Sequence, residues 1–268
     1  MRRFKLLIPL VFSMLIVVSC STSPTGRSQM IWKSDAELEA QSARAFNQMR
    51  AGMPLSTDRR KIDFVACVAE GVVAVLEPPY DEIEWELAVF DSESVNAFAM
   101  PGGKIGVFTG ILEITENQHQ LAAVIGHEIA HVTARHSNER ASRASMTNVG
   151  IDVAAIILGG GNRGATYTAQ QALGAGAALG ISLPHTRGQE SEADVIGLEY
   201  MAKAGFDPRE SVTLWQRMDA TTDKKPAEFV STHPSSESRI EALVSQWPKT
   251  LPLYNEAIEE GRVPTCTK

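Results

Sequence analysis

The sequence predicts an α+β fold that is mainly helical and contains one small sheet. Apolar residues recur at helical spacing over much of the chain, whereas short extended segments are confined to the stretch between residues 83 and 108. The 268 residues are 44% hydrophobic and show no internal repeat. A chain of this length and composition suits one compact domain with its own hydrophobic core.

Start and stop signals delimit the expected helices. Ser34 and Glu37 form a capping box that opens the first helix, and Pro78-Pro79 ends the second. Gly205 suits the position just after a helix, and Asp207-Pro208 starts the next one. The helices are expected at about 35–50, 58–77, 109–115, 117–136, 138–158 and 189–204, from 207 onward, and from Ser235 to Trp247, where Pro248 ends the last.

Three short segments make up the expected sheet. They cover residues 83–89, 95–100 and 104–108, and a Pro-Gly-Gly turn joins the second to the third. Residues 159–184 are rich in Gly and Ala, and neither of their apolar runs reaches the ~20 residues of a transmembrane helix. They are interpreted either as a loop with a small-residue helix near the functional site or as a closely packed helix.

The N-terminus has the features of a bacterial lipoprotein signal. A short basic segment precedes an apolar stretch that is too short to span a bilayer, and Cys20 follows it. Residues 1–19 are therefore expected to be a lipoprotein signal peptide, with lipid attached to Cys20 after cleavage. An ordinary signal peptide, cut near Ser19 to Ser23, is the alternative.

This signal sets the expected domain organisation and location. Residues 20–30, rich in Ser, Thr, Pro and Gly, are expected to be a flexible tether. Residues 31–250 would form the folded domain, and residues 251–268 a C-terminal tail. The protein is expected in the bacterial cell envelope, anchored to the membrane through Cys20. Ser21, rather than Asp, after the lipidated cysteine favours the outer membrane, with the domain facing the periplasm.

The net charge argues against nucleic-acid binding, and the cysteine content leaves open whether a disulfide forms. The formal charge is −7 and basic residues form no patch beyond the first few positions, so nucleic-acid binding is not expected. An exported protein folds in an oxidising compartment, where Cys67 and Cys266 could form a disulfide. Two free thiols are the alternative, because the sequence does not give the distance between them.

The pattern His127-Glu128-Ile129-Ala130-His131 is the main chemical signal. On a helix, the two histidines lie one turn apart on the same face and can bind one Zn²⁺ ion. Glu128 lies beside them and can act as the general base toward water. His136, five residues after His131, is expected to point away from this face, and with His119 and His185 to lie at the surface or behind the ligands.

A third metal ligand is expected further along the chain, because catalytic zinc usually has three protein ligands. No histidine follows at metzincin spacing. The best candidate is Glu190, with Asp194 one turn later to accept a hydrogen bond from the outer nitrogen of His127. Glu192 is expected to point elsewhere. The alternative for Glu190 and Asp194 is a solvated acidic face.

Several motifs together resemble the M48 peptidases, in particular their soluble bacterial lipoprotein members. The resemblance covers roughly residues 24–247. The motifs are Asn96 to Gly103, the His-Glu-x-x-His helix, Arg187 with Glu190 and Asp194, Thr232-His233-Pro234 and Arg239-Ile240. It implies a thermolysin-like gluzincin core with one zinc ion per chain, Glu190 as third ligand, and an edge strand through Asn96, Ala97 and Phe98 beside the metal. A peptide substrate would add to that edge as a further strand.

The resemblance leaves two residues with open roles. His233 could stabilise the oxyanion of the reaction, could occupy the zinc ion in a resting state, or could be a structural loop histidine. Arg239 could orient the same site or merely bridge to an acidic helix.

The sequence therefore predicts a zinc-dependent endopeptidase with Glu128 as general base and polypeptides as substrates. By resemblance, those substrates are misfolded or misassembled envelope proteins, and envelope assembly machinery is a further candidate partner. The alternatives are an envelope chaperone or assembly factor that binds chains with little or no proteolysis, and a lipoprotein with a purely structural metal.

Overall fold

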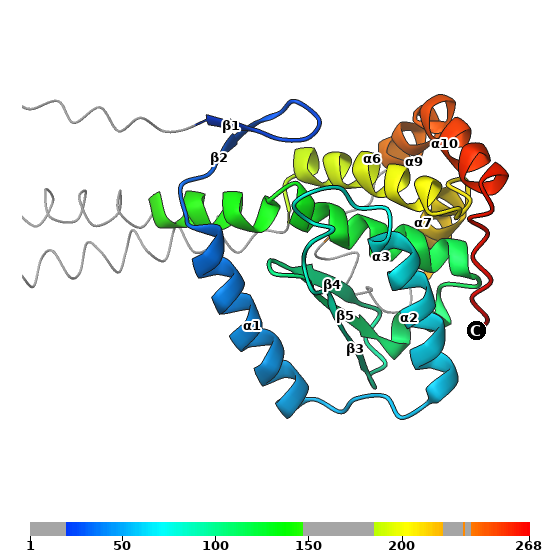
Figure 1. Cartoon of the computed structure of the whole chain (residues 1–268), viewed down its shortest axis with the longest axis horizontal. Helices are drawn as coiled ribbons and strands as arrows, with labels where there is room; N and C mark the ends of the chain where they lie inside the picture. Colours follow the sequence, from blue (N-terminus) through cyan, green and yellow to red (C-terminus); the bar gives the residue numbers. More distant parts are fainter. Residues whose placement is uncertain (1–19, 147–184, 222–232, 234–236) are drawn as a thin grey trace, which may run out of the picture.

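The computed structural model describes residues 20–146, 185–221, 233 and 237–268 (Figure 1). Its architecture is α+β and mainly helical, which confirms the predicted fold class. The elements are β1 (Cys20–Thr22), β2 (Ser28–Met30), α1 (Asp35–Gly52), α2 (Arg59–Val73), β3 (Glu86–Phe90), β4 (Ala97–Met100), β5 (Lys104–Phe108), η1 (Thr109–Glu113), α3 (Gln118–Thr133), α6 (Arg187–Lys203), α7 (Glu210–Thr221), α9 (Glu237–Ser245) and α10 (Trp247–Glu259). Residues 136–146 are also helical. The expected signal peptide at 1–19 and the Gly/Ala-rich stretch at 159–184 lie outside the described residues.

The small sheet has the strand order β3-β5-β4. Strand β5 lies in the middle, parallel to β3 and antiparallel to β4. Within the described part of the chain, β4 thus has one strand neighbour and an open edge. Strand β3 begins at Glu86, three residues later than the alternation of side chains predicts. Helix α3, which carries His127 and His131, packs against β4.

Helix α3 runs through the centre of the domain and packs against α2, α6, α7 and β4 (Figure 1). The side chain of Asn117 caps its N-terminus by accepting hydrogen bonds from the backbone of His119 and Gln120. Every residue of the helix from Gln120 onward is buried, apart from Ala123. A helix buried on all sides can carry polar side chains only where other groups satisfy them.

Helices α3 and α6 approach each other closely because a glycine lies on each. A Cβ atom on Gly126 would meet the carbonyl oxygen of Gly197 at 2.9 Å. A Cβ atom on Gly197 would meet the backbone nitrogen of His127 at 2.8 Å. Real Cβ atoms do not approach so closely, so only glycine fits at either position. The backbones therefore touch one residue before His127.

Residues 20–30 form a hairpin instead of the flexible tether that the sequence predicts. Strands β1 and β2 pair in register from Cys20 opposite Met30 to Thr22 opposite Ser28. Gln29 is buried and donates a hydrogen bond to the carbonyl of Ala134, beyond the end of α3. Polar composition predicts a loop here, but these residues are ordered by partners more than 100 positions away.

The C-terminal region is also more ordered than the predicted tail. Pro248 does not end a helix but occupies the first turn of α10, where the missing N–H is no loss, and that helix runs on to Glu259. A disulfide then joins Cys266 to Cys67 on α2, with 5.7 Å between their Cα atoms. Of the two alternatives for these cysteines, the structure contains the bridged form.

Local capping differs from the prediction at two helices. Ser34 precedes α1 but its side chain makes no capping hydrogen bond. A complete capping box occurs instead at Thr186 and Gln189, which start α6. Gly205 follows α6 with φ at 83°, the left-handed conformation expected after a helix end. None of the described helices combines the length and apolar character needed to cross a bilayer.

We expect Gly197→Ala to lower the free energy of unfolding by about 1–3 kcal/mol, because the added methyl group forces α3 and α6 apart. Urea denaturation of the metal-free protein measures this. Gly188→Ala is the matched control on the same helix, since its Cβ would meet only Thr186 Oγ1 at 4.0 Å. This control should be neutral or slightly stabilising. An unchanged midpoint for Gly197→Ala would show that the crossing does not depend on glycine.

Candidate metal centre

The two histidines of α3 face each other in the buried centre of the domain. His127 and His131 are 3% and 2% exposed, and their Nε2 atoms are 3.0 Å apart. Glu128 is 4% exposed. Among the described residues, its Oε1 atom has no hydrogen-bond partner. Three ionisable side chains thus lie in the core, and one carboxylate oxygen lacks the hydrogen bond that burial normally requires.

Helix α6 brings a carboxylate to the same place. Glu190 Oε2 lies 3.4 Å from His127 Nε2, and Glu190 Oε1 lies 3.5 Å from His131 Nε2. Both Glu190 and Asp194 are buried, so the solvated acidic face considered as an alternative does not occur. The spacing of one helical turn places both acids on the side of α6 that faces α3.

Asp194 and Arg239 support His127 from behind. Asp194 Oδ1 lies 3.0 Å from Nδ1 of His127, so the ring donates its Nδ1 hydrogen to this carboxylate and turns its Nε2 atom toward the cluster. Arg239, on α9, donates to both carboxylate oxygens of Asp194 at 2.6 Å and lies 3.2 Å from Glu190. Its guanidinium stacks 3.6 Å above the ring of Trp215. Arg239 thus bridges to both buried acids of α6.

His233 lies in the same cluster. Its Nδ1 atom is 3.0 Å from Glu190 Oε1 and 3.2 Å from His127 Nε2, while its Nε2 atom lies 3.4 Å from Glu128 Oε1. His233 is 4% exposed. The structure therefore gives this histidine contacts with two of the expected ligands and with the expected base, unlike a loop histidine with a purely local role.

His136 contradicts the prediction that it points away from the paired histidines. Its Nδ1 atom lies 2.8 Å from Nδ1 of His131, and the residue is fully buried. The prediction extrapolated α3 to residue 136. The helix ends at Thr133, and Arg135 adopts a positive φ of 58°, which turns the chain back toward His131. His185 also lies close, with its ring 4.0 Å from that of His131.

Opposing charges set the protonation of the cluster. Burial lowers the pKa of His127, but hydrogen bonds to Asp194 and Glu190 outweigh it and raise that pKa to about 9. Burial raises the pKa of Glu190, but hydrogen bonds from His127 and His233 bring it well below its usual range. The cluster thus stabilises a positive charge between the imidazoles and the carboxylates.

These side chains fit a zinc ion. One ligand atom from each of His127, His131, Glu190 and His233 lies within 4.8 Å of all the others. Two imidazole nitrogens and a carboxylate are a common donor set for catalytic zinc, whose bonds to nitrogen are ~2.0–2.1 Å. The carboxylates that favour a proton on His127 also favour a metal cation. His131, His136 and His185 form a second group of nitrogen atoms behind the first.

The open edge of the sheet lies beside this cluster. Ala97 and Phe98 belong to β4, and Asn96 directly precedes it, as expected. Burial raises the pKa of Glu128, and the nearby backbone of Ala99 in β4 is among the groups that oppose this rise. Helix α3, which carries Glu128, packs against β4.

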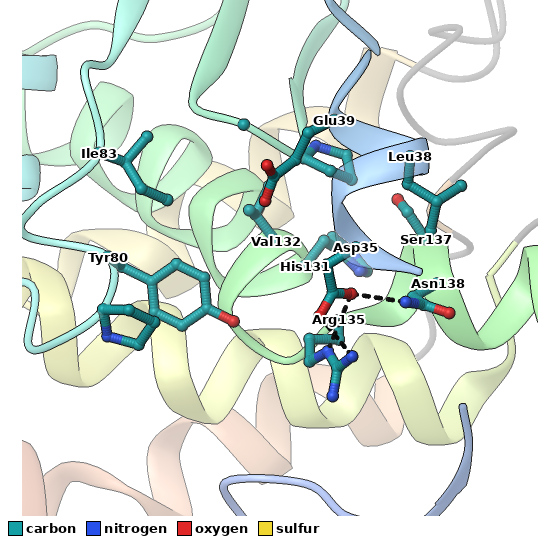
Figure 2. A pocket seen from close by; sticks show the side chains of 13 residues that line it. Asp35, Leu38, Glu39, Tyr80, Ile83, His131, Val132, Arg135, Ser137 and Asn138 are labelled. Atoms are coloured by element: carbon teal, nitrogen blue, oxygen red, sulfur yellow. Dashed lines mark hydrogen bonds and ion pairs between the residues drawn. The ribbon is translucent and has the colours of Figure 1, made fainter. Parts of the chain in front are cut away.

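A cavity of about 190 Å³ lies between α1, the segment around Tyr80 and Ile83, and the turn after β4 (Figure 2). His131 and Val132 line it, so the cavity borders the cluster. Ion-paired Asp35 and Arg135 form part of its wall (Figure 2).

The sequence matches the profile described as Peptidase family M48 over residues 61–246. This match covers more than half of the chain. The chain belongs to peptidase family M48. Metallopeptidases of this family are zinc dependent, in agreement with the donor set found here.

Curated relatives support this membership. The mitochondrial metalloendopeptidase OMA1 of Schizosaccharomyces pombe is 38% identical over 186 residues, which are 69% of this chain and 52% of the relative. OMA1 of Bos taurus is 32% identical over 256 residues, which are 90% of this chain and 49% of the relative. The β-barrel assembly-enhancing protease of Yersinia pestis is 32% identical over 199 residues, which are 72% of this chain and 40% of the relative. The chain thus spans about half the length of these relatives, or less.

Sequence reasoning missed several residues that shape the site. The stacking of Trp215 on Arg239 was not predicted. Gly126 and Gly197 carry no signal individually, because their close approach depends on which helices meet. His136 could have been found only if the end of α3 at Thr133 had been recognised.

We expect Glu190→Ala to weaken zinc binding by more than ~100-fold, beyond the 10–100-fold loss typical for outer partners of metal ligands. Chelator competition on the purified protein measures this affinity. Glu199→Ala is the matched control, because Glu199 lies two turns later on α6 and its carboxylate pairs with Lys249. Equal affinities for the two variants would exclude Glu190 as a ligand.

Proposed function

We propose that this protein is a zinc-dependent endopeptidase. The observation that carries the proposal is the position of Glu128. Its buried Oε1 atom has no hydrogen-bond partner among the described residues, in a cluster that fits zinc and beside an open strand edge. A purely structural zinc site would need neither the acid nor the edge.

The proposed mechanism assigns each group a separate task. His127, His131 and Glu190 would hold the zinc ion, which would supply the Lewis acidity that polarises the scissile carbonyl and makes water a better nucleophile. Glu128 takes the proton of the attacking water and passes it to the leaving amine nitrogen. Burial raises the pKa of Glu128, which suits a group that must hold a proton between these two transfers. Asp194 keeps His127 in the tautomer that presents Nε2.

We further propose that the substrate is an extended polypeptide that pairs with β4. The open edge of β4 and the packing of α3 against this strand support this, because a strand added there passes close to the base. The cavity bounded by His131, Tyr80 and Ile83 can take a side chain of such a peptide. The apolar part of its wall, which includes Tyr80, Ile83 and Val132, favours an apolar side chain, while Glu39 and the ion-paired Asp35 and Arg135 make up its charged part.

His233 has two candidate roles in this mechanism. It can stabilise the oxyanion of the scissile carbonyl, or it can complete a four-ligand zinc site that is inactive at rest. The contacts of His233 Nδ1 with Glu190 and with His127 Nε2 favour the second role, because a fourth ligand would approach from that side. The same contacts also favour a second candidate function, in which the protein binds polypeptide chains with little proteolysis.

The cellular setting is inferred from sequence and from relatives. We propose a bacterial envelope protein held at the outer membrane by lipid on Cys20, with misfolded or misassembled envelope proteins as substrates. The relative from Yersinia pestis, named a β-barrel assembly-enhancing protease, supports this setting and a link to envelope assembly machinery.

We expect Glu128→Gln to abolish cleavage of casein by the zinc-loaded protein while leaving one zinc ion bound per chain. The amide has nearly the same shape as the acid but cannot accept the proton of water. Cleavage is followed by release of labelled peptides, and zinc by elemental analysis. Full activity in Glu128→Gln, at equal zinc content, would refute the proposed role of this residue.

We expect His233→Ala to accelerate casein cleavage if His233 occupies zinc at rest, and to slow it by ~10²–10³-fold if His233 stabilises the oxyanion. The same assay, with zinc content measured in parallel, separates the two roles. No cleavage by zinc-loaded wild type or His233→Ala would favour the chain-binding factor instead of the peptidase.

A further inference from the structure

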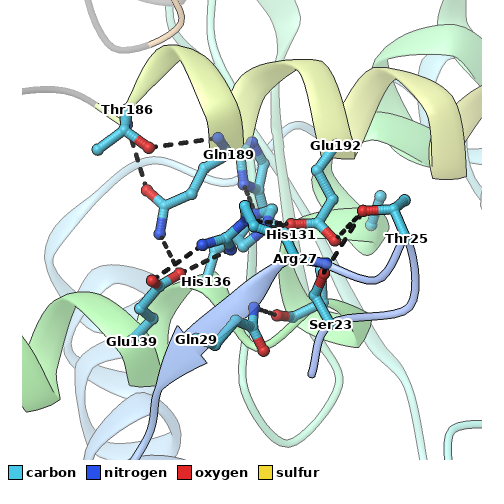
Figure 3. A network of polar contacts seen from close by, with 12 residues as sticks. Ser23, Thr25, Arg27, Gln29, His131, His136, Glu139, Thr186, Gln189 and Glu192 are labelled. Atoms are coloured by element: carbon cyan, nitrogen blue, oxygen red, sulfur yellow. Dashed lines mark hydrogen bonds and ion pairs between the residues drawn. The ribbon is translucent and has the colours of Figure 1, made fainter. Parts of the chain in front are cut away.

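The hairpin formed by β1 and β2 is linked to the metal cluster through a chain of polar groups that starts at exposed Thr25 and half-buried Arg27 and ends at buried His136 and His131 (Figure 3). Thr25 and Arg27, between its two strands, both reach Glu192 on α6. Glu192 in turn contacts His136, and His136 contacts His131. Residues near the N-terminus are therefore linked by hydrogen bonds to an expected zinc ligand more than 100 positions away.

Arg27 holds the acidic members of this chain. Its Nε atom donates to Glu192 at 2.8 Å, and its two terminal nitrogens donate to Glu139 at 3.0 and 2.7 Å. The side chains of Glu139 and Glu192 are 0% and 2% exposed. A planar guanidinium can bridge two carboxylates in this way, whereas a lysine ammonium lacks the fixed fork. Arg27 thus compensates two buried acids at once.

The direction of the hydrogen bonds determines the tautomer of His131. Glu192 accepts hydrogen bonds from the Thr25 hydroxyl at 2.6 Å and from Arg27, so it faces His136 as an acceptor. His136 Nε2, 3.1 Å away, must then carry the hydrogen, which leaves a lone pair on its Nδ1. His131 Nδ1 lies 2.8 Å from His136 Nδ1 and donates a hydrogen bond to its lone pair. The Nε2 atom of His131 then carries a lone pair and faces His127 Nε2 in the cluster.

His127 is oriented by a shorter route. Its Nδ1 hydrogen is accepted directly by Asp194, on the adjacent helix. For His131, the group that accepts the Nδ1 hydrogen is a second histidine, His136. The carboxylate of Glu192 then accepts a hydrogen bond from His136. The hairpin is required only on this longer route.

We propose that the β1–β2 hairpin is a structural part of the metal centre, and that Arg27, Glu192 and His136 are positioning residues that hold His131 with Nε2 presented to zinc. The proposal rests on the proposed zinc function of the cluster. It assigns residues 20–30 a role in metal affinity that a passive tether would not have.

The test measures zinc affinity by chelator competition on the full chain, independently of proteolysis. We expect His136→Phe, which keeps a flat ring but has no nitrogen, and Arg27→Ala each to weaken zinc binding by ~10–100-fold. His136→Gln should recover most of the affinity, because its amide oxygen can accept from His131 while its nitrogen donates to Glu192. Arg143→Ala is the matched control, since Arg143 donates to Glu139, which is not part of the route from Glu192 through His136 to His131.

Two readouts keep the test decisive. Circular dichroism and the unfolding midpoint of the metal-free proteins identify a variant that fails to fold, and Arg27→Ala, at a partly exposed side chain, then carries the test alone. Zinc affinities of His136→Phe and Arg27→Ala within threefold of wild type would overturn the proposal, as would an equal loss in Arg143→Ala. Failure of the proposed function would differ, because wild type would then bind zinc without cleaving casein.

Discussion

The close contact between α3 and α6 sets the geometry on which the rest of the molecule depends. Gly126 and Gly197 let the two backbones touch, and any side chain at either position would separate them. His127 directly follows one glycine, and Asp194 precedes the other by about one turn. The distance between the histidines of one helix and the acids of the other is therefore set by backbone contact, which is stiffer than contact between side chains.

That geometry places many charges in a dry core, and their compensation explains much of the surrounding structure. A buried acid without a partner is strongly destabilising. Arg239 satisfies Asp194 on one side of the cluster, and Arg27 satisfies Glu139 and Glu192 on the other. Each arginine comes from an element outside the α3–α6 pair. The C-terminal helices and the N-terminal hairpin can thus be understood as the outer layer of a polar centre.

The sequence predicts the inner part of this arrangement well and the outer part poorly. The spacing of His127 and His131, and of Glu190 and Asp194, reflects the helical repeat, which is a local property. The hairpin at residues 20–30 has the composition of a loop, and its order comes from partners such as Glu192 that are remote in sequence. The position of His136 depends on a left-handed residue, Arg135, that periodicity does not reveal. Such features depend on tertiary partners or on single backbone conformations, and the periodicity of the sequence reveals neither.

The long sequence separations in the centre have a consequence for when the site can form. Thr25 and Glu192 are 167 positions apart, His127 and Arg239 are 112 apart, and the disulfide joins cysteines separated by 199. A chain emerging from its N-terminus holds the paired histidines long before Glu190 and Arg239 are available. Such contacts also form slowly, because a large loop must close first. A growing chain therefore cannot bring the four clustered side chains together until its C-terminal helices have been made.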